Sequence, residues 1–188
     1  MKGNWTRRDA LLSAAGLTGL LLNTEWLDSA HAQATNYESH PLYRLADTLA
    51  DIVIPQTDTP GASAAKVGGF VLFALERGMS GLSLSLLEAA QTELNAMAGG
   101  DFLALSASRR VRILTDLDRR AYETEVIDDK SPDAAWRRIK GVIVAGYYTS
   151  EIGATKELIS EPVPGRFANM RLTADFRSRS NDVQGGTL

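Results

Sequence analysis

The chain contains no cysteine, and this absence excludes several kinds of functional site. Without thiols there is no disulfide, no thiolate zinc site, no iron–sulfur cluster and no covalently attached c-type haem. Histidine is nearly as scarce, with only His31 and His40. One or two imidazoles do not build a multi-histidine metal site. We interpret His40, which precedes Pro41, as a solvated residue in the capping region of a helix.

The chain also has little net charge, because 20 basic residues face 23 acidic ones and leave −3. It therefore lacks the basic face that nucleic acid requires, and we expect no nucleic-acid partner. It lacks a phosphate-binding loop as well. Gly68-Gly69 stand outside any G-x-G-x-x-G motif and instead predict a helix that packs close to a neighbour. We expect no catalytic residue, bound cofactor or metal in this chain.

What the sequence does contain is a pair of arginines, Arg7 and Arg8, directly before an apolar stretch that ends at Leu22. The small residues Ala30 and Ala32 follow as an A-x-A cleavage site, which completes the layout of an export signal. Paired arginines indicate the twin-arginine route, which exports folded proteins. We predict a signal peptide over residues 1–32 and a periplasmic location. Because the chain has no evident way to hold a large cofactor, we infer that it is exported for the sake of a partner.

An N-terminal membrane anchor is the alternative interpretation of this segment. Its apolar run is about 13 residues long, whereas a span takes about 20. We therefore favour the cleaved signal and expect contact with the membrane only through a larger complex. Removal of residues 1–32 leaves about 156 residues, which suits one domain with a modest core.

Five segments carry apolar residues at helical spacing and predict an all-α fold, a small irregular helical bundle with no strand pair. Pro55 and Gly99-Gly100 mark helix ends. The predicted helices span residues 41–54, 64–76, 83–98, 106–123 and 132–148. Their inward stripes are, in order, Leu42, Leu45, Leu49 and Ile52; Phe70, Phe73 and Leu75; Leu87, Ala90, Leu94 and Met97; Val111, Leu114, Leu117 and Ala121; and Trp136, Ile139, Val142 and Ile143.

The pattern changes after Gly146, where a glycine- and aromatic-rich corner is followed by prolines that favour extended chain. We predict a helical domain over residues 33–165, which begins with a short polar linker from Gln33 to Ser39, and an extended partner-binding tail over residues 166–188. For Tyr147 and Tyr148, packing on the chain's own bundle and packing on a partner remain equally open; beyond Pro162 we favour the partner. The candidate interface residues are Tyr147, Tyr148, Glu151, Pro162, Pro164, Arg166, Phe167, Met170, Arg171 and Phe176.

Three features together resemble the gluconate 2-dehydrogenase subunit 3 family, the small subunits of membrane-associated sugar dehydrogenases. They are the twin-arginine signal, the run Ala46-Asp47-Thr48-Leu49-Ala50-Asp51-Ile52-Val53-Ile54-Pro55 with the later Pro60-Gly61-Ala62, and the corner Gly146-Tyr147-Tyr148-Thr149-Ser150-Glu151-Ile152-Gly153. The resemblance covers most of residues 1–165.

The resemblance implies a non-catalytic subunit. In that family FAD and the active site belong to a large flavoprotein subunit of the glucose–methanol–choline oxidoreductase type, and a c-type cytochrome commonly takes the electrons. The small subunit supplies the export signal and acts as a chaperone for the large one. The segment from Glu161 to Gly165 further resembles small subunits of enzymes that oxidise glucosides at C3.

Two alternatives come from other classes of protein. The first is an independent periplasmic enzyme that uses carboxylates such as Asp47, Asp51 and Asp58. Asp47 and Asp51 lie one helical turn apart, but we interpret them as solvated face residues, because no third ligand accompanies them. The second alternative is a free-standing periplasmic module that binds a small sugar.

Overall fold

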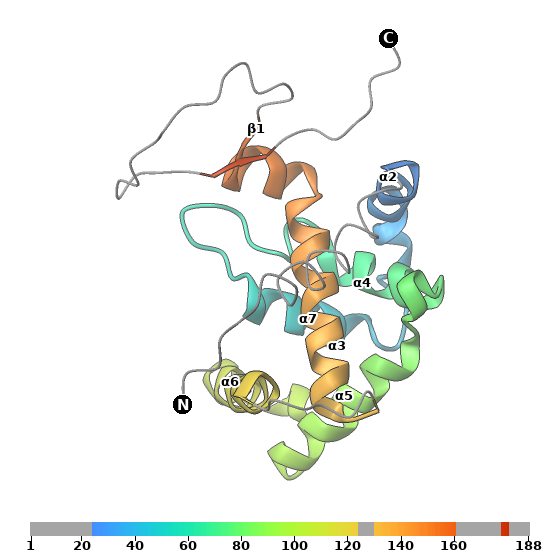
Figure 1. The fold of residues 1–188 in the computed structure, drawn as a ribbon. Helices are drawn as coiled ribbons and strands as arrows, with labels where there is room; N and C mark the ends of the chain where they lie inside the picture. Colours follow the sequence, from blue (N-terminus) through green and yellow to red (C-terminus); the bar gives the residue numbers. More distant parts are fainter. Residues whose placement is uncertain (1–23, 124–129, 161–177, 181–188) are drawn as a thin grey trace.

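The structure is a computed structural model, and it describes residues 24–123, 130–160 and 178–180. Its elements are α2 (Thr24–Gln33), η1 (Ala34–Tyr37), α3 (Tyr43–Val53), α4 (Val67–Glu76), η2 (Met79–Gly81), α5 (Leu84–Ala98), η3 (Phe102–Ala104), α6 (Ala107–Glu123), α7 (Pro132–Tyr148), η4 (Gly153–Glu157), β1 (Ile159–Ser160) and β2 (Arg179–Ser180) (Figure 1). The predicted all-α class is confirmed. The five predicted helices are all present, and their bounds differ from the prediction by at most three residues.

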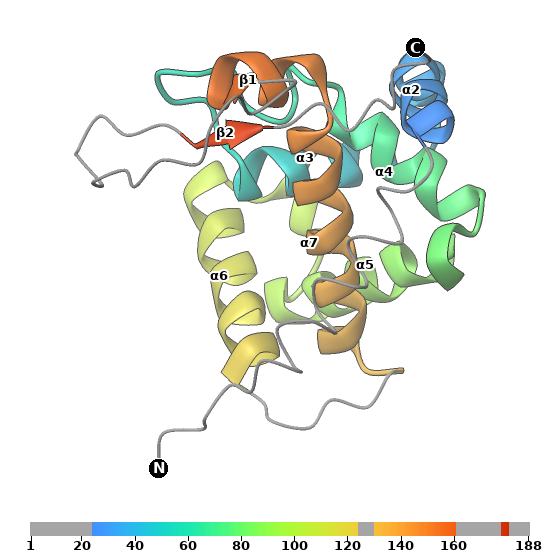
Figure 2. The same cartoon turned by 45° about the horizontal axis from the view of Figure 1, so that its top comes forward.

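Helix α4 lies at the centre of the core, and nine of its ten residues are buried. Two glycines at its start allow this close packing. A Cβ at Gly68 would lie 2.8 Å from Cα of Asp47 in α3, and a Cβ at Gly69 would overlap the carbonyl of Ala34. The predicted role of Gly68-Gly69 in close helix packing is thus confirmed. Helix α7 passes through the middle of the molecule and contacts α3, α4, α5 and α6 (Figure 2).

The inward stripes of the helices agree with the sequence pattern in most positions. Leu45, Leu87, Leu117 and Ile139 are each at most 1% exposed. Val111 is an exception, because its side chain is 45% exposed near the start of α6, and its predicted core position is wrong. The buried residues of α6, which contacts α5 and α7, begin one turn later, at Leu114. Helical spacing alone extended the buried stripe back to Val111, which is exposed.

Asp47 is a second correction. It was predicted to be solvated, but it is half-buried against Gly68, and its Oδ1 has no hydrogen-bond partner. Burial is the main reason why the pKa of its carboxyl group is raised, since a buried carboxylate loses hydration. Asp51, one turn later, is exposed as predicted. The two carboxylates lie on the same face of α3, so the difference arises along the helix: Gly68, at the start of α4, packs against Asp47, whereas Asp51 is exposed.

Residues 24–37 also differ from expectation. The segment from Gln33 to Ser39 was predicted to be a polar linker, but α2 and η1 pack on α4, and Ala30 and Ala34 are at most 1% exposed. The packed helical region therefore begins before residue 33. Strand β1 pairs with β2 in parallel, with Ile159 opposite Arg179, so a two-residue strand pair is present where none was predicted. Among the described residues, no helix is long and apolar enough to cross a membrane.

Candidate partner interface

Two segments that are far apart in the sequence meet at the C-terminal end of α7. One is the loop over residues 55–62 that follows α3, and the other runs from Tyr147 to β1 (Figure 2). The phenol of Tyr147 donates a hydrogen bond of 2.6 Å to the carbonyl of Pro60, across 87 residues of chain. The hydroxyl of Thr59 donates to the carboxylate of Glu157. We call residues 55–62 and 147–160 together the motif corner, because they contain parts of both short motifs found in the sequence.

The loop over residues 55–62 closes on the end of α3. Pro55 ends the helix, and the amide of Ala62 donates a bond of 2.9 Å to the carbonyl of Ile54. Gly61 makes this closure possible, because a Cβ there would lie 2.6 Å from the amide nitrogen of Gln56 and 2.8 Å from the carbonyl oxygen of Ile54. The spacing of Pro55, Pro60 and Gly61 thus specifies a compact loop of fixed shape.

The end of α7 is held by a buried serine. Ser150 is 5% exposed, and its hydroxyl donates to the carbonyl of Tyr147 at 2.6 Å while accepting from the amide of Gly153 at 3.1 Å. Gly153 must remain small, because a Cβ there would overlap the carbonyl oxygen of Tyr147. The hydroxyl of Thr149 donates to the carbonyl of Ala145 at 2.7 Å. These hydroxyls add a second hydrogen bond to carbonyls at the helix end that also accept from the amides of Thr149 and Ser150.

The two adjacent tyrosines have different roles. Tyr147 is 1% exposed, and burial raises the pKa of its phenol. The side chain of Tyr147 packs inside the chain's own helical bundle and supports the motif corner from there. Of the two alternatives, packing on the bundle and packing on a partner, the structure shows the first for Tyr147. Tyr148 is 40% exposed, with its ring edge-on to that of Tyr147 at 5.3 Å. Glu151 is exposed, and Ile159 is 40% exposed.

An aromatic ring, an aliphatic side chain and a carboxylate are therefore presented on a rigid segment that ends in β1. Rigid aromatic anchors of this kind are typical of protein interfaces. The other candidate interface residues, Pro162, Pro164, Arg166, Phe167, Met170, Arg171 and Phe176, lie outside the described residues, as do Arg7 and Arg8. Thr59, Glu157 and Ser150 were not among the predicted site residues, because their roles depend on contacts that no local pattern predicts.

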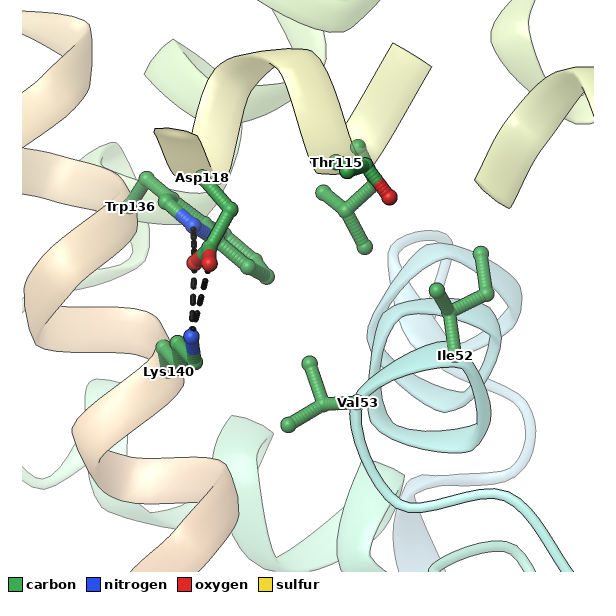
Figure 3. A pocket seen from close by; sticks show the side chains of 7 residues that line it. Ile52, Val53, Thr115, Asp118, Trp136 and Lys140 are labelled. Atoms are coloured by element: carbon green, nitrogen blue, oxygen red, sulfur yellow. Dashed lines mark hydrogen bonds and ion pairs between the residues drawn. The ribbon is translucent and has the colours of Figure 1, made fainter. Parts of the chain in front are cut away.

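A pocket of about 190 Å³ lies between α3, α6 and α7 (Figure 3). Its lining residues are Ile52, Val53, Leu114, Thr115, Asp118, Trp136 and Lys140. Asp118 accepts from the indole of Trp136 at 2.8 Å and from Lys140 at 2.7 and 2.9 Å. The polar groups are thus bonded to one another. Ligand sites are commonly larger, about 300–1,000 Å³, and direct a few polar groups toward the ligand.

The carboxylates of the enzyme alternative do not form a cluster. Among residues 24–123, 130–160 and 178–180 no group of three or more His, Asp or Glu side chains could hold a metal ion. Asp58 is exposed in the loop and accepts from Thr57 at 3.0 Å. His40 accepts from the amide of Leu42 at 3.1 Å through Nδ1, just before α3, which confirms its predicted position in the capping region. Its side chain is only 21% exposed, with Nε2 3.6 Å from the carboxylate of Glu76, so the prediction that it is solvated is wrong.

The described residues form a small helical domain with a partly apolar corner at the end of α7. The family model described as Gluconate 2-dehydrogenase subunit 3 matches residues 42–165, which include both short motifs. The chain belongs to the gluconate 2-dehydrogenase subunit 3 family, whose members are accessory subunits of a dehydrogenase complex. Searches of curated proteins and of solved structures gave no match.

Proposed function

We propose that this chain is the non-catalytic small subunit of a periplasmic FAD-dependent sugar dehydrogenase, of the glucoside 3-, gluconate or glucose type. It supplies the export signal and acts as a chaperone for the flavoprotein large subunit, which holds FAD and the catalytic site. A c-type cytochrome is a further candidate partner. The observation that carries the proposal is that the family match includes both motifs and that these motifs interlock into one rigid corner.

Among the residues that the structure describes, neither the paired glycines nor the pocket fits a flavin. Gly68 and Gly69 are occupied by helix packing against Asp47 and Ala34, so they cannot cradle a pyrophosphate. The pocket beside Trp136 has a volume of about 190 Å³, below the usual range even for ligands smaller than FAD. Both considerations support placing FAD in the partner.

The interface assignment is tested by comparing two exposed tyrosines. Tyr148 lies at the motif corner and is 40% exposed, whereas Tyr122 lies on α6 and is 53% exposed. Each tyrosine is replaced by alanine, and the variant is co-expressed with the large subunit. We expect Tyr148→Ala to weaken association about tenfold or more and Tyr122→Ala to leave it unchanged. Equal effects of the two substitutions would remove the corner from the interface.

The export assignment is tested with the pair Arg7 and Arg8. Their replacement by lysine keeps the charge but removes the planar guanidinium groups. Both this chain and its partner should then stay in the cytoplasm. Periplasmic dehydrogenase activity that survives the double substitution would contradict the proposed role as carrier of the export signal.

The sugar-binding module has one observation in its favour, the pocket beside Trp136, but Asp118 and Lys140 are bonded to each other there. Calorimetry with the isolated chain and glucose or gluconate decides the matter. We expect no micromolar binding, and such binding would favour this alternative. The enzyme alternative is tested by adding sugars and an artificial electron acceptor to the same chain, where turnover without the large subunit would support it.

A further inference from the structure

The A-x-A site predicted for signal cleavage lies inside helix α2 (Thr24–Gln33). Ala30 is fully buried and belongs to the hydrophobic core, and Ala34, one turn later, is 1% exposed. Ala32 is exposed. The two alanines that a signal peptidase reads are thus on different sides of a helix, one turned to the core and one turned to solvent.

Several contacts hold this helix on the bundle. The ring of His31 stacks on Phe70 of α4, with ring centroids 4.7 Å apart. Nε2 of His31 lies 3.1 Å from the hydroxyl of Thr149. Since that hydroxyl donates its own hydrogen to the carbonyl of Ala145, it accepts here, and Nε2 of His31 is the donor.

The segment that follows α2 is held as well. A Cβ at Gly69 would overlap the carbonyl oxygen of Ala34, so the backbones of η1 and α4 touch directly. The phenol of Tyr37 donates to Glu76 at 2.7 Å, and its ring packs edge-on to Phe73 at a centroid distance of 6.3 Å. Residues 30–37 therefore form a continuous contact with α4.

Cleavage at such a site needs a different backbone conformation. In an extended chain, residues two apart point to the same side, which allows one protease surface to read Ala30 and Ala32 together. In a helix these residues are about 200° apart, and here the first methyl group lies in the core. Proteolysis of a folded segment proceeds through its local opening.

We propose that the docking of α2 on α4 and on Thr149, just after α7, withholds the Ala30-His31-Ala32 site from signal peptidase, so that the folded chain keeps residues 1–32. This inference rests on the proposed export function, because a chain that crosses the membrane folded meets the peptidase with α2 already docked. The segment that carries the export signal then remains attached to the subunit.

The test uses the purified full-length chain and signal peptidase in detergent micelles, with a synthetic peptide of residues 20–40 as the unfolded reference. Products are identified by mass spectrometry. We expect the folded chain to be cleaved after Ala32 at least about tenfold more slowly than the peptide. Cleavage of the folded chain at the rate of the peptide would overturn the inference and leave the export assignment standing.

Two glycine-to-alanine substitutions distinguish the release of α2 from the bundle from the effect of adding a methyl group elsewhere. Gly69→Ala pushes on the carbonyl of Ala34 and should bring the cleavage rate close to that of the peptide. Gly141→Ala is the control, since a Cβ there meets nothing within 4 Å, and it should leave the chain resistant. Gly69→Ala that folds and stays resistant would contradict the inference.

A third variant covers the case in which Gly69→Ala does not fold. Thr149→Val removes the acceptor for His31 at nearly constant size, and it should speed cleavage while the helical circular dichroism is retained. An unchanged rate would count against the docking mechanism. If the reference peptide itself resists the peptidase, the A-x-A assignment and this inference both fail, whereas the proposed pairing with a flavoprotein is unaffected.

Discussion

The two ends of α7 are stabilised by different kinds of interaction. At its N-terminal end, Ser131 caps the helix by accepting from the amide of Ala134 at 3.1 Å, and Asp133 forms an ion pair with Arg120. At its C-terminal end, the motif corner depends on backbone contact at Gly153 and on the buried hydroxyls of Tyr147 and Ser150. At the N-terminal end, water can take over the hydrogen bonds of the capping serine and the ion pair. At the C-terminal end, close backbone contact and buried hydroxyls leave no room for a different side chain.

This difference suggests which end has a shape that function requires. Exposed ion pairs contribute little to stability and tolerate substitution. Buried polar groups and close backbone contacts fix one geometry, because each unsatisfied group costs free energy. A surface that must match a partner benefits from the second kind of support, and Tyr148 and Glu151 are presented on it.

The largest effect is expected for Gly153→Ala. The added methyl group overlaps the carbonyl of Tyr147, so the end of α7 must shift, and we expect a loss of about 2–3 kcal/mol in the free energy of unfolding. Gly141→Ala, in the open part of the same helix, should be neutral or slightly stabilising. Urea unfolding of both variants measures the difference. If the two behave alike, the corner is not the rigid region that we describe.

The next effect concerns Tyr147→Phe. The substitution keeps the ring in the core but leaves the carbonyl of Pro60 without its donor, which should cost about 1–2 kcal/mol. Tyr148→Phe is the matched control, since that ring is 40% exposed. Thermal unfolding should show a lower Tm for Tyr147→Phe alone. A lower Tm for both variants would mean that the hydroxyl of Tyr147 has no special role.

A pH dependence follows from the same residue. Burial raises the pKa of Tyr147 in the folded chain above its value of about 10 in the unfolded chain. As the pH rises, the unfolded chain loses this proton first. The stabilisation is thus complete below about pH 10 and is lost as the pH rises through the folded-state pKa. Urea unfolding from neutral to alkaline pH should show this loss, and its slope should be shallower for Tyr147→Phe. Equal slopes in the two proteins would contradict the assignment.

The sequence predicted the two ends of α7 unequally. The start at Pro132 could be located because capping and the N1 preference for proline are local signals. The fit of Tyr147 to Pro60 could not be predicted, because it joins residues 87 positions apart. The two short motifs contain Pro60 and Tyr147, but neither motif shows that these residues touch.

The docking of α2 was missed for a similar reason. Ala30 and Ala34 are small residues with no strong apolar pattern, and their burial depends on the missing side chain of Gly69. The A-x-A pattern, which predicts a processing site, lies in a helix that packs on the core. The half-burial of Asp47 was missed for the same reason, since it depends on the contact with Gly68 of α4.

The smallest effect is expected at the charged end. Arg120 bonds Glu93 at 2.7 Å and Asp133 at 2.8 Å, but its side chain is 44% exposed. Glu93 and Asp133 are 23% and 19% exposed, so both carboxylates keep some contact with water when Arg120 is removed, and we expect Arg120→Ala to cost about 1 kcal/mol. Added salt screens exposed charges, so the difference between wild type and variant should shrink as ionic strength rises. For Tyr147→Phe the difference should stay constant, because its hydrogen bond joins two uncharged groups. Urea unfolding at low and high salt checks both expectations. A salt-dependent effect at Tyr147, or a large salt-independent one at Arg120, would remove the distinction between the two ends of α7.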